Sequence, residues 1–157
     1  MKACCFTGHR VIEAQHLESL RTDVRAVIEK LYAAGIREFR CGGALGFDTL
    51  AALEVLAFRR EREDVSLVLM LPCRDQDKVW TPSQKQLYNE ILEQADEVRV
   101  LAEHYYRGCM FVRNRALVDG SECCIAYLTS DRGGTKMTVN YAEKQGVNVI
   151  NLGGKTI

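Results

Sequence analysis

Val65-Ser66-Leu67-Val68-Leu69-Met70-Leu71 is the longest apolar run of the chain, and it ends at Pro72. Such a nearly continuous run predicts a β-strand that is covered on both faces, as strands are in a parallel sheet. On either side of it, short apolar runs alternate with amphipathic stretches of ten or more residues. Because parallel strands are joined through crossover helices, we expect a doubly wound, mostly parallel α/β sheet with helices on both faces.

The same periodicity gives the expected order of the elements. Six strands are predicted over 3–6, 38–41, 65–71, 97–101, 123–128 and 147–152. Five helices are predicted over 17–34, 48–60, 82–95, 109–118 and 135–145. No linker or internal repeat interrupts this pattern, so we expect one domain over residues 1–152 and a C-terminal tail over 153–157.

Composition and charge restrict the classes of partner. The 157 residues are 47% hydrophobic and 27% charged, which is typical of a globular domain. Because 21 Lys and Arg balance 21 Asp and Glu, there is no overall field to attract nucleic acid or an anionic membrane, and neither is expected as a partner. No run approaches the ~20 apolar residues of a membrane span, and the N-terminal sequence is unlike a signal peptide. We therefore expect a cytoplasmic protein whose anion binding is local.

The seven cysteines have no spacing typical of a metal site or a disulfide framework. Cys4-Cys5 and Cys123-Cys124 lie in predicted strands, where adjacent side chains point to opposite faces and cannot share one metal ion. We expect the cysteines to be small buried hydrophobes, and we expect neither a metal site nor a required cofactor.

Chemical motifs follow the predicted strands, at the edge of the sheet where doubly wound proteins bind ligands. The first motif is Thr7-Gly8-His9-Arg10. Its glycine permits a tight turn, Thr7 supplies a hydroxyl, and Arg10 supplies a guanidinium suited to phosphate or carboxylate. By itself this motif is explained equally well by an ordinary turn with a solvated arginine.

The second motif, Gly42-Gly43-Ala44-Leu45-Gly46-Phe47-Asp48, opens the predicted second helix. Three glycines in five positions would let backbone N–H groups converge on an anion at the helix N-terminus. Asp48 is interpreted either as the helix cap or as an acceptor for ribose hydroxyls, and the two roles are compatible.

Two further motifs belong to the fourth and fifth predicted helices. Arg113-Asn114-Arg115 inserts polar residues among apolar ones, so that some of them are expected to point toward the ligand crevice. Asp131-Arg132-Gly133-Gly134-Thr135-Lys136-Met137-Thr138 again places a glycine pair at a helix start, with two hydroxyls for phosphate oxygens. Two such helix starts at neighbouring strand ends favour a nucleotide-type anion site over coincidental turn chemistry.

Taken in order, these motifs resemble the YpsA-like branch of the SLOG superfamily, the Rossmann-like group named for Smf/DprA and the LOG phosphoribohydrolases. The resemblance extends to Leu71-Pro72 with Gln76 and Trp80, and to Tyr105 ahead of Arg113-Asn114. It implies a crevice for a nucleotide-derived ligand, and related domains often pair, which makes a homo-oligomer the expectation. The residues expected to bind the ligand are Thr7, Gly8, Arg10, Gly42, Gly43, Ala44, Gly46, Asp48, Trp80, Arg113, Asn114, Gly133, Gly134, Thr135 and Thr138.

Three functions are compatible with these motifs and with the resemblance to the SLOG superfamily. The first is binding or sensing of a nucleotide-derived ligand. The second is hydrolysis of the N-glycosidic bond of a nucleoside monophosphate, as similar LOG proteins perform, with Asp48 or Asp131 as the candidate catalytic carboxylate. The LOG pattern has a Glu soon after its Gly-Thr, whereas the first acid after Thr138 here is Glu143. The third and least favoured is DprA-like DNA binding, because the net charge is balanced.

Overall fold

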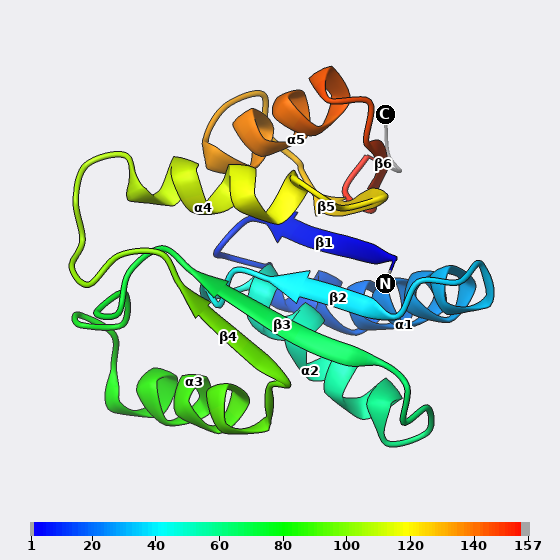
Figure 1. The fold of residues 1–157 in the computed structure, drawn as a ribbon, viewed down its shortest axis with the longest axis horizontal. Helices are drawn as coiled ribbons and strands as arrows, with labels where there is room; N and C mark the ends of the chain where they lie inside the picture. The colour runs from blue at the N-terminus through cyan, green and yellow to red at the C-terminus, as the bar shows by residue number, and fades with distance from the viewer. Residues whose placement is uncertain (1, 155–157) are drawn as a thin grey trace.

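The computed structural model describes residues 2–154 and contains one six-stranded sheet (Figure 1). Every adjacent pair of strands is parallel, and the strand order is β4-β3-β2-β1-β5-β6. This confirms the doubly wound α/β prediction. The strands are β1 (Ala3–Gly8), β2 (Glu38–Cys41), β3 (Ser66–Leu71), β4 (Glu97–Val100), β5 (Cys123–Tyr127) and β6 (Asn148–Asn151).

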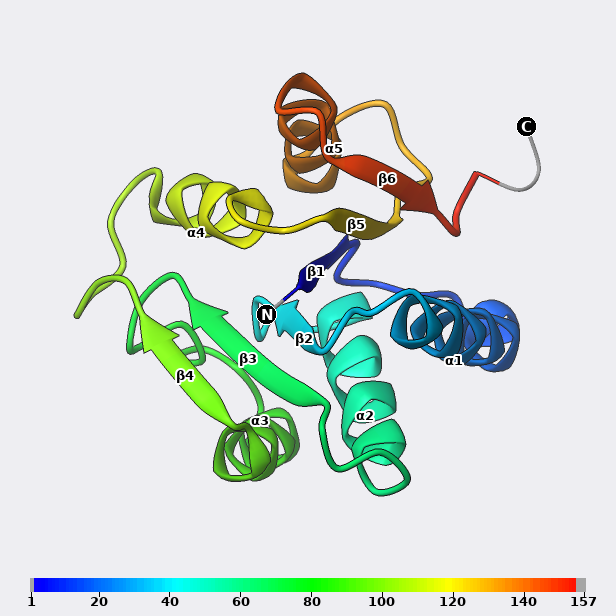
Figure 2. The ribbon, with the colours of Figure 1, turned by 45° about the vertical axis from the view of Figure 1, so that its right-hand side comes forward.

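Helices cover both faces of the sheet, as Figures 1 and 2 show. α1, α2 and α3 lie on one face, and α4 and α5 lie side by side on the other. A short 3-10 helix, η1 (Ala14–His16), precedes α1 and was not expected, because three residues are too few to show a periodicity. The α-helices are α1 (Leu17–Ala33), α2 (Phe47–Arg59), α3 (Pro82–Gln94), α4 (Cys109–Val118) and α5 (Gly134–Lys144).

The central strands are apolar on both sides because each side has its own core. In β3, Leu67 and Leu69 pack into the core beneath α1–α3, whereas Val68 and Met70 pack into the core beneath α4 and α5. This division follows from the two-residue repeat of a strand. Because both faces of β3 are buried, its sequence is a nearly continuous apolar run.

All seven cysteines are buried free thiols, as expected. The register places Cys4 opposite Cys123 and Cys5 opposite Cys124, one pair on each face of the sheet. Within residues 2–154 there is no cluster of three or more His, Cys, Asp or Glu side chains that could hold a metal ion. None of the helices that the structure describes has both the length and the apolar character needed to cross a bilayer.

The order of the strands reverses at β1. The chain proceeds outward from β1 through β2 and β3 to β4, and then crosses to the other side of β1 to form β5 and β6. The segments after β1 and β5 therefore diverge, which leaves space at the carboxyl ends of these two strands. Of the expected tail, Gly153 and Gly154 follow β6 outside any helix or strand, and residues 155–157 lie outside the described part of the chain.

Candidate functional site

A cavity of about 360 Å³ lies at the carboxyl ends of β1 and β5, where the strand order reverses. The segments after β1, β2 and β5, together with α4, contribute to its walls. The cavity therefore brings together the four motifs that the sequence places at strand ends. Its lining residues are Phe6, Thr7, Gly8, His9, Arg10, Ala44, Asp48, Met110, Phe111, Arg113, Asn114, Leu117, Gly134 and Thr135.

The N-terminus of α5 presents free backbone donors to this cavity. Gly133 is the N-cap, with a φ of 104° that favours glycine, and no side chain caps the helix. The amides of Gly134, Thr135 and Lys136 have no acceptor within the helix, because the first turn lacks the preceding carbonyls. Since Gly134 and Thr135 line the cavity, this helix end is suited to an anion.

The glycine-rich loop before α2 differs from the expected amide cradle. The N–H of Ala44 donates to Asp48 Oδ2 at 3.2 Å, and the N–H of Phe47 donates to the carbonyl of His9 at 3.1 Å. These two donors are occupied by the protein's own oxygens, so part of this loop bonds to the protein itself and is not open to a ligand.

The glycines of this loop instead permit close packing. A Cβ on Gly42 would lie 2.6 Å from Arg113 Nη1 and 2.9 Å from Asp48 Oδ2. A Cβ on Gly46 would lie 2.3 Å from the carbonyl oxygen of Arg10, and Gly46 has a φ of 78°. Gly46 thus lets the start of α2 approach the segment after β1, and Gly42 leaves room for the Arg113 side chain. Neither these two glycines nor Gly43 lines the cavity.

Asp48 is buried in the wall of the cavity. The N-cap of α2 is Gly46 and no side chain caps that helix, so the capping interpretation of Asp48 is wrong. Burial raises the pKa of Asp48 above its ordinary value, while the Arg113 guanidinium and the N–H of Ala44 act in the opposite direction. The result is a shielded carboxyl group that faces the place where a ligand would sit.

Arg113 is the second buried charge and is 5% exposed. Its Nη1 donates to the carbonyl oxygen of Gly42 at 2.5 Å, and its Nε donates to Asn114 Oδ1 at 2.9 Å. Burial lowers the pKa of Arg113, and the nearby Asp48 carboxylate raises it. Arg115, by contrast, is exposed and lies over the ring of Tyr141, 5.5 Å from its centroid. The polar cluster in α4 therefore splits between the cavity and the surface.

His9 lines the cavity and was not among the expected ligand residues. Its Nε2 accepts the N–H of Thr129 at 2.9 Å, and its ring packs edge-on against Tyr127. His9 thereby joins the segment after β1 to the segment after β5. The signal for it was its position inside the first motif, between Gly8 and Arg10.

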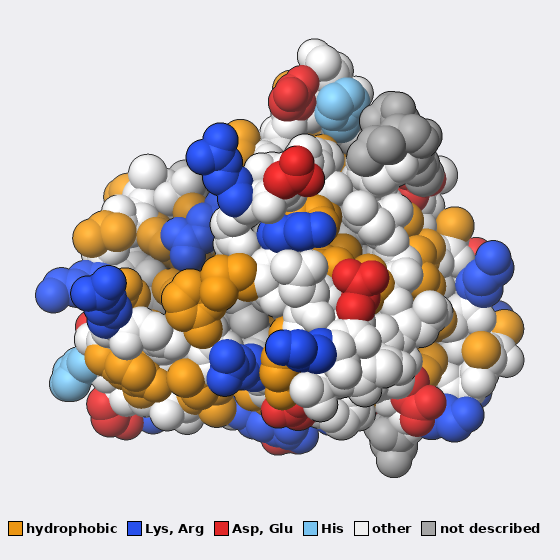
Figure 3. Space-filling model, turned by 90° about the horizontal axis from the view of Figure 1, so that it is seen from above, with side chains coloured by type: hydrophobic (Ala, Val, Ile, Leu, Met, Phe, Trp, Pro, Cys, Tyr) orange, Lys and Arg blue, Asp and Glu red, His pale blue; other side chains and the backbone are white. Residues whose placement is uncertain are grey.

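The apolar residues of α4 that line the cavity had no signal in the sequence. Met110 and Phe111 occupy the first turn of α4, and Phe111 is 44% exposed. Figure 3 looks onto the side formed by α4 and α5, where hydrophobic side chains gather among lysines and arginines. An apolar side chain at a helix surface shows no pattern that separates a cavity wall from a plain surface.

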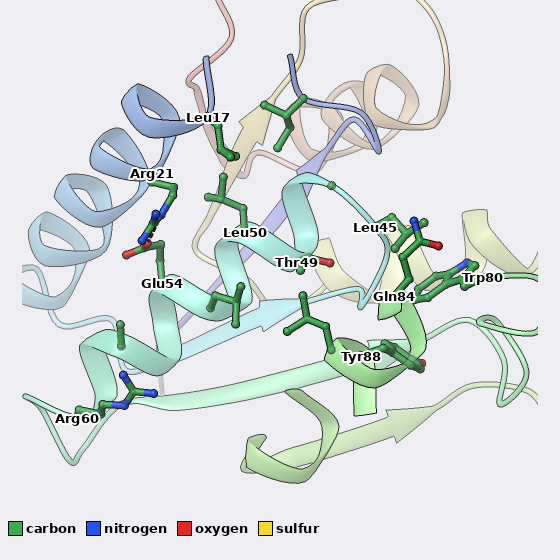
Figure 4. Close-up of a pocket in the computed structure, with 15 residues that line it drawn as sticks. Leu17, Arg21, Leu45, Thr49, Leu50, Glu54, Arg60, Trp80, Gln84 and Tyr88 are labelled. Atoms are coloured by element: carbon green, nitrogen blue, oxygen red, sulfur yellow. Dashed lines mark hydrogen bonds and ion pairs between the residues drawn. The ribbon is translucent and has the colours of Figure 1, made fainter. Parts of the chain in front are cut away.

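The remaining expected ligand residues lie elsewhere. Trp80 and Gly46 line a separate groove of about 710 Å³ between α1, α2 and α3 (Figure 4). The hydroxyl of Thr138 donates to the carbonyl of Gly134 at 2.9 Å, so it is used inside α5. Gly133 and the exposed Asp131 precede α5 without lining the cavity.

The parallel sheet, with a cavity where its strand order reverses, defines a Rossmann-like α/β protein. The YpsA family model, described as the YspA SLOG family, matches residues 4–151. The chain belongs to this family, which confirms the resemblance seen in the sequence.

Two relatives illustrate how far the sequence similarity extends. The uncharacterized SPbeta prophage-derived protein YoqJ of Bacillus subtilis is 30% identical over 138 residues, which cover 80% of this chain and 81% of that protein. The UPF0398 protein BH1768 of Halalkalibacterium halodurans is 26% identical over 144 residues, covering 86% of this chain and 76% of that protein.

Solved structures share the fold at lower sequence identity. The DNA processing protein DprA of Streptococcus pneumoniae superimposes with a TM-score of 0.71 at 18% identity, over 96% of this chain and 50% of that chain. DprA of Helicobacter pylori, described with a single-stranded DNA binding mode, gives 0.68 at 17% identity, over 96% of this chain and 64% of that chain. The chain thus spans half to two thirds of these DprA proteins.

Proposed function

We propose that the protein binds a phosphorylated, nucleotide-derived small molecule in the cavity at the ends of β1 and β5. The observation that carries this proposal is the uncapped N-terminus of α5, whose Gly134 and Thr135 line the cavity. Free amides and the helix dipole together favour a phosphate at this position.

The rest of the cavity supports the same ligand class. Its volume of about 360 Å³ falls within the range of small-molecule sites. Arg10 supplies an exposed guanidinium at the cavity, whereas the charge of Arg113 is balanced by the nearby Asp48. Asn114 and Thr7 add neutral polar groups for the sugar. A polyanion such as DNA is less well matched, because the chain carries no net charge.

The test removes one donor from the helix end. Gly134 is the first residue of α5, where proline is tolerated, so Gly134→Pro deletes a single N–H and leaves the helix in place. The matched control is Gly134→Ala, which keeps the N–H and has room for its Cβ, 3.9 Å from Asn114 Nδ2. The ligand panel contains nucleoside monophosphates, ADP-ribose and cyclic dinucleotides.

We expect at least one member of the panel to stabilise the wild type in a thermal-shift assay. Its affinity should be retained by Gly134→Ala and fall about tenfold or more in Gly134→Pro, as expected for the loss of a hydrogen bond to a charged group. A panel without any stabilising member, or equal affinities of the two variants, contradicts the proposal.

Asp48 favours a second candidate function, hydrolysis of the N-glycosidic bond of a nucleoside monophosphate. A buried carboxyl group with a raised pKa in the same cavity is suited to general acid or base chemistry. This function predicts that AMP or GMP releases free base, and that Asp48→Asn, which keeps an acceptor for the N–H of Ala44, abolishes the release. If the wild type binds these nucleotides but releases no base, hydrolysis is excluded and only the binding function remains.

A further inference from the structure

A second hollow, of about 460 Å³, adjoins the cavity and has a different chemical character. Arg10 and Met110 line both spaces, so the two are neighbours. The walls of the hollow include Trp80, from the segment after β3, and Tyr105, from the segment after β4. One space therefore offers backbone donors for an anion, and the next offers aromatic side chains.

The protein holds the ring of Trp80 in place and anchors the backbone of Tyr105. Trp80 is half-buried and packs edge-on against Tyr88, with 5.0 Å between the ring centroids. Tyr88 in turn accepts a hydrogen bond at 3.0 Å from Nε2 of Gln76, which also lines the hollow. On the opposite segment, the N–H of Tyr105 donates to Asp75 Oδ1 at 3.1 Å, while the side chain of Tyr105 is 62% exposed.

We propose that this hollow holds the base of the ligand, so that the ligand is a nucleotide with its base intact and not a sugar phosphate. The proposal rests on the function proposed above, with the phosphate at the N-terminus of α5. Any nucleobase can stack on an aromatic side chain, whichever base it is, because every base has a π-face. The Asp75 carboxylate, which also accepts the N–H of Tyr105, supplies acceptor oxygens in the same hollow for the edge of the base.

The experiment uses the single tryptophan of the chain, Trp80, as its reporter. The probes are AMP, GMP and ADP-ribose, compared with ribose 5-phosphate, with excitation at wavelengths that the bases do not absorb. Affinities are measured in parallel by calorimetry. The test variant is Tyr105→Ala, and its matched control is Tyr106→Ala, which removes an exposed tyrosine that does not line the hollow.

We expect at least one of the three base-containing probes to quench Trp80 emission and to bind at least tenfold more tightly than ribose 5-phosphate, which should not quench. Tyr105→Ala should weaken the nucleotide about tenfold and leave ribose 5-phosphate unchanged, while Tyr106→Ala should resemble the wild type. Equal affinities for nucleotide and ribose 5-phosphate, or equal effects of the two tyrosine variants, overturn the inference but leave phosphate binding intact. If calorimetry detects none of the four probes, the inference and the proposed function both fail.

Discussion

At the scale of single residues, a glycine can be required for its backbone angle, for the space that a side chain would fill, or for both. Gly46 is required for both reasons. Its φ of 78° and its contact with the Arg10 carbonyl both oppose a side chain. Gly108 has a similar φ of 97° but nothing within 4 Å of its Cβ position. Gly108 therefore carries only the strain of the left-handed region, with a ψ of −6°, whereas Gly46 combines a clash with a ψ of −121° that is more strongly restricted to glycine.

Gly108→Ala should lower the free energy of unfolding by about 1 kcal/mol, the cost of a positive φ for a residue with a Cβ. Gly46→Ala should lower it by about 3 kcal/mol or more, because α2 must also move away from the segment after β1. Urea denaturation of both variants measures the two costs. Equal losses would mean that the contact with Arg10 carries no energetic weight.

His9 should make stability depend on pH. Burial lowers the pKa of His9 from its ordinary value of 6.5, and its Nε2 can accept the N–H of Thr129 only while unprotonated. The unfolded chain therefore takes up a proton at a higher pH than the folded protein. The contribution of His9 is fully present above pH 6.5 and is lost as the pH falls through 6.5 toward the lower folded pKa.

The comparison variant is His9→Gln, which keeps an acceptor for Thr129 but does not titrate. The wild type should lose more stability than this variant between pH 7.5 and pH 5.5 in urea denaturation. Parallel stability curves over this range would exclude His9 as the titrating group.

At the scale of elements, the sequence predicted which helices and strands exist but not how the loops between them are bonded. Apolar periodicity is local, and the predicted bounds of 109–118 for α4 agree with the structure. The hydrogen bond from Phe47 to His9 joins segments that are brought together only by the pairing of β1 with β2. The sequence therefore could not show that part of the first glycine-rich loop bonds to the protein itself.

The N-terminus of α3 is capped by a side chain, and the contribution of this cap should be measurable. Thr81 Oγ1 accepts the N–H of Gln84, Gln84 Oε1 accepts the N–H of Thr81, and Pro82 follows at the first helical position. Thr81→Ala should cost about 1 kcal/mol of unfolding free energy. Thr22→Ala, in the exposed middle of α1, should change stability by less than about 0.5 kcal/mol. Similar changes in urea denaturation would contradict a stabilising cap.

At the scale of the whole molecule, two cores on either side of one sheet explain how adjacent cysteines in a strand can both be buried. Members of both cores, Cys4 and Cys5, follow each other along β1. The burial of both cysteines was predictable from the sequence, because they are adjacent in an apolar strand whose successive side chains point to opposite faces. The cavity was predictable only in part, since its position follows from the strand order, while its apolar wall at Met110 and Phe111 depends on how α4 lies on the sheet.

Because all seven cysteines are buried, we expect the native protein to be inert toward thiol reagents. Burial keeps the reagent away from all seven thiols, and it also raises the pKa of Cys73 to about 11. The hydrogen bond with Cys4 lowers the pKa of Cys123, so at that position exclusion of the reagent is the protection. Ellman's reagent at pH 8 should detect almost no thiol in the native protein and seven after denaturation in guanidinium chloride. A fast-reacting thiol in the native state would show that one of these positions opens to solvent.

The central position of β1 also bears on how the protein matures during synthesis. β1 is synthesised before the other five strands, yet the partners of Cys4 to Gly8 on one side, Cys123 to Tyr127, are translated more than a hundred residues later. Until then the nascent chain exposes an unpaired apolar edge, which is a template for aggregation. A chain truncated before β5 should therefore be prone to aggregation, because the edge of β1 that pairs with β5 stays unpaired.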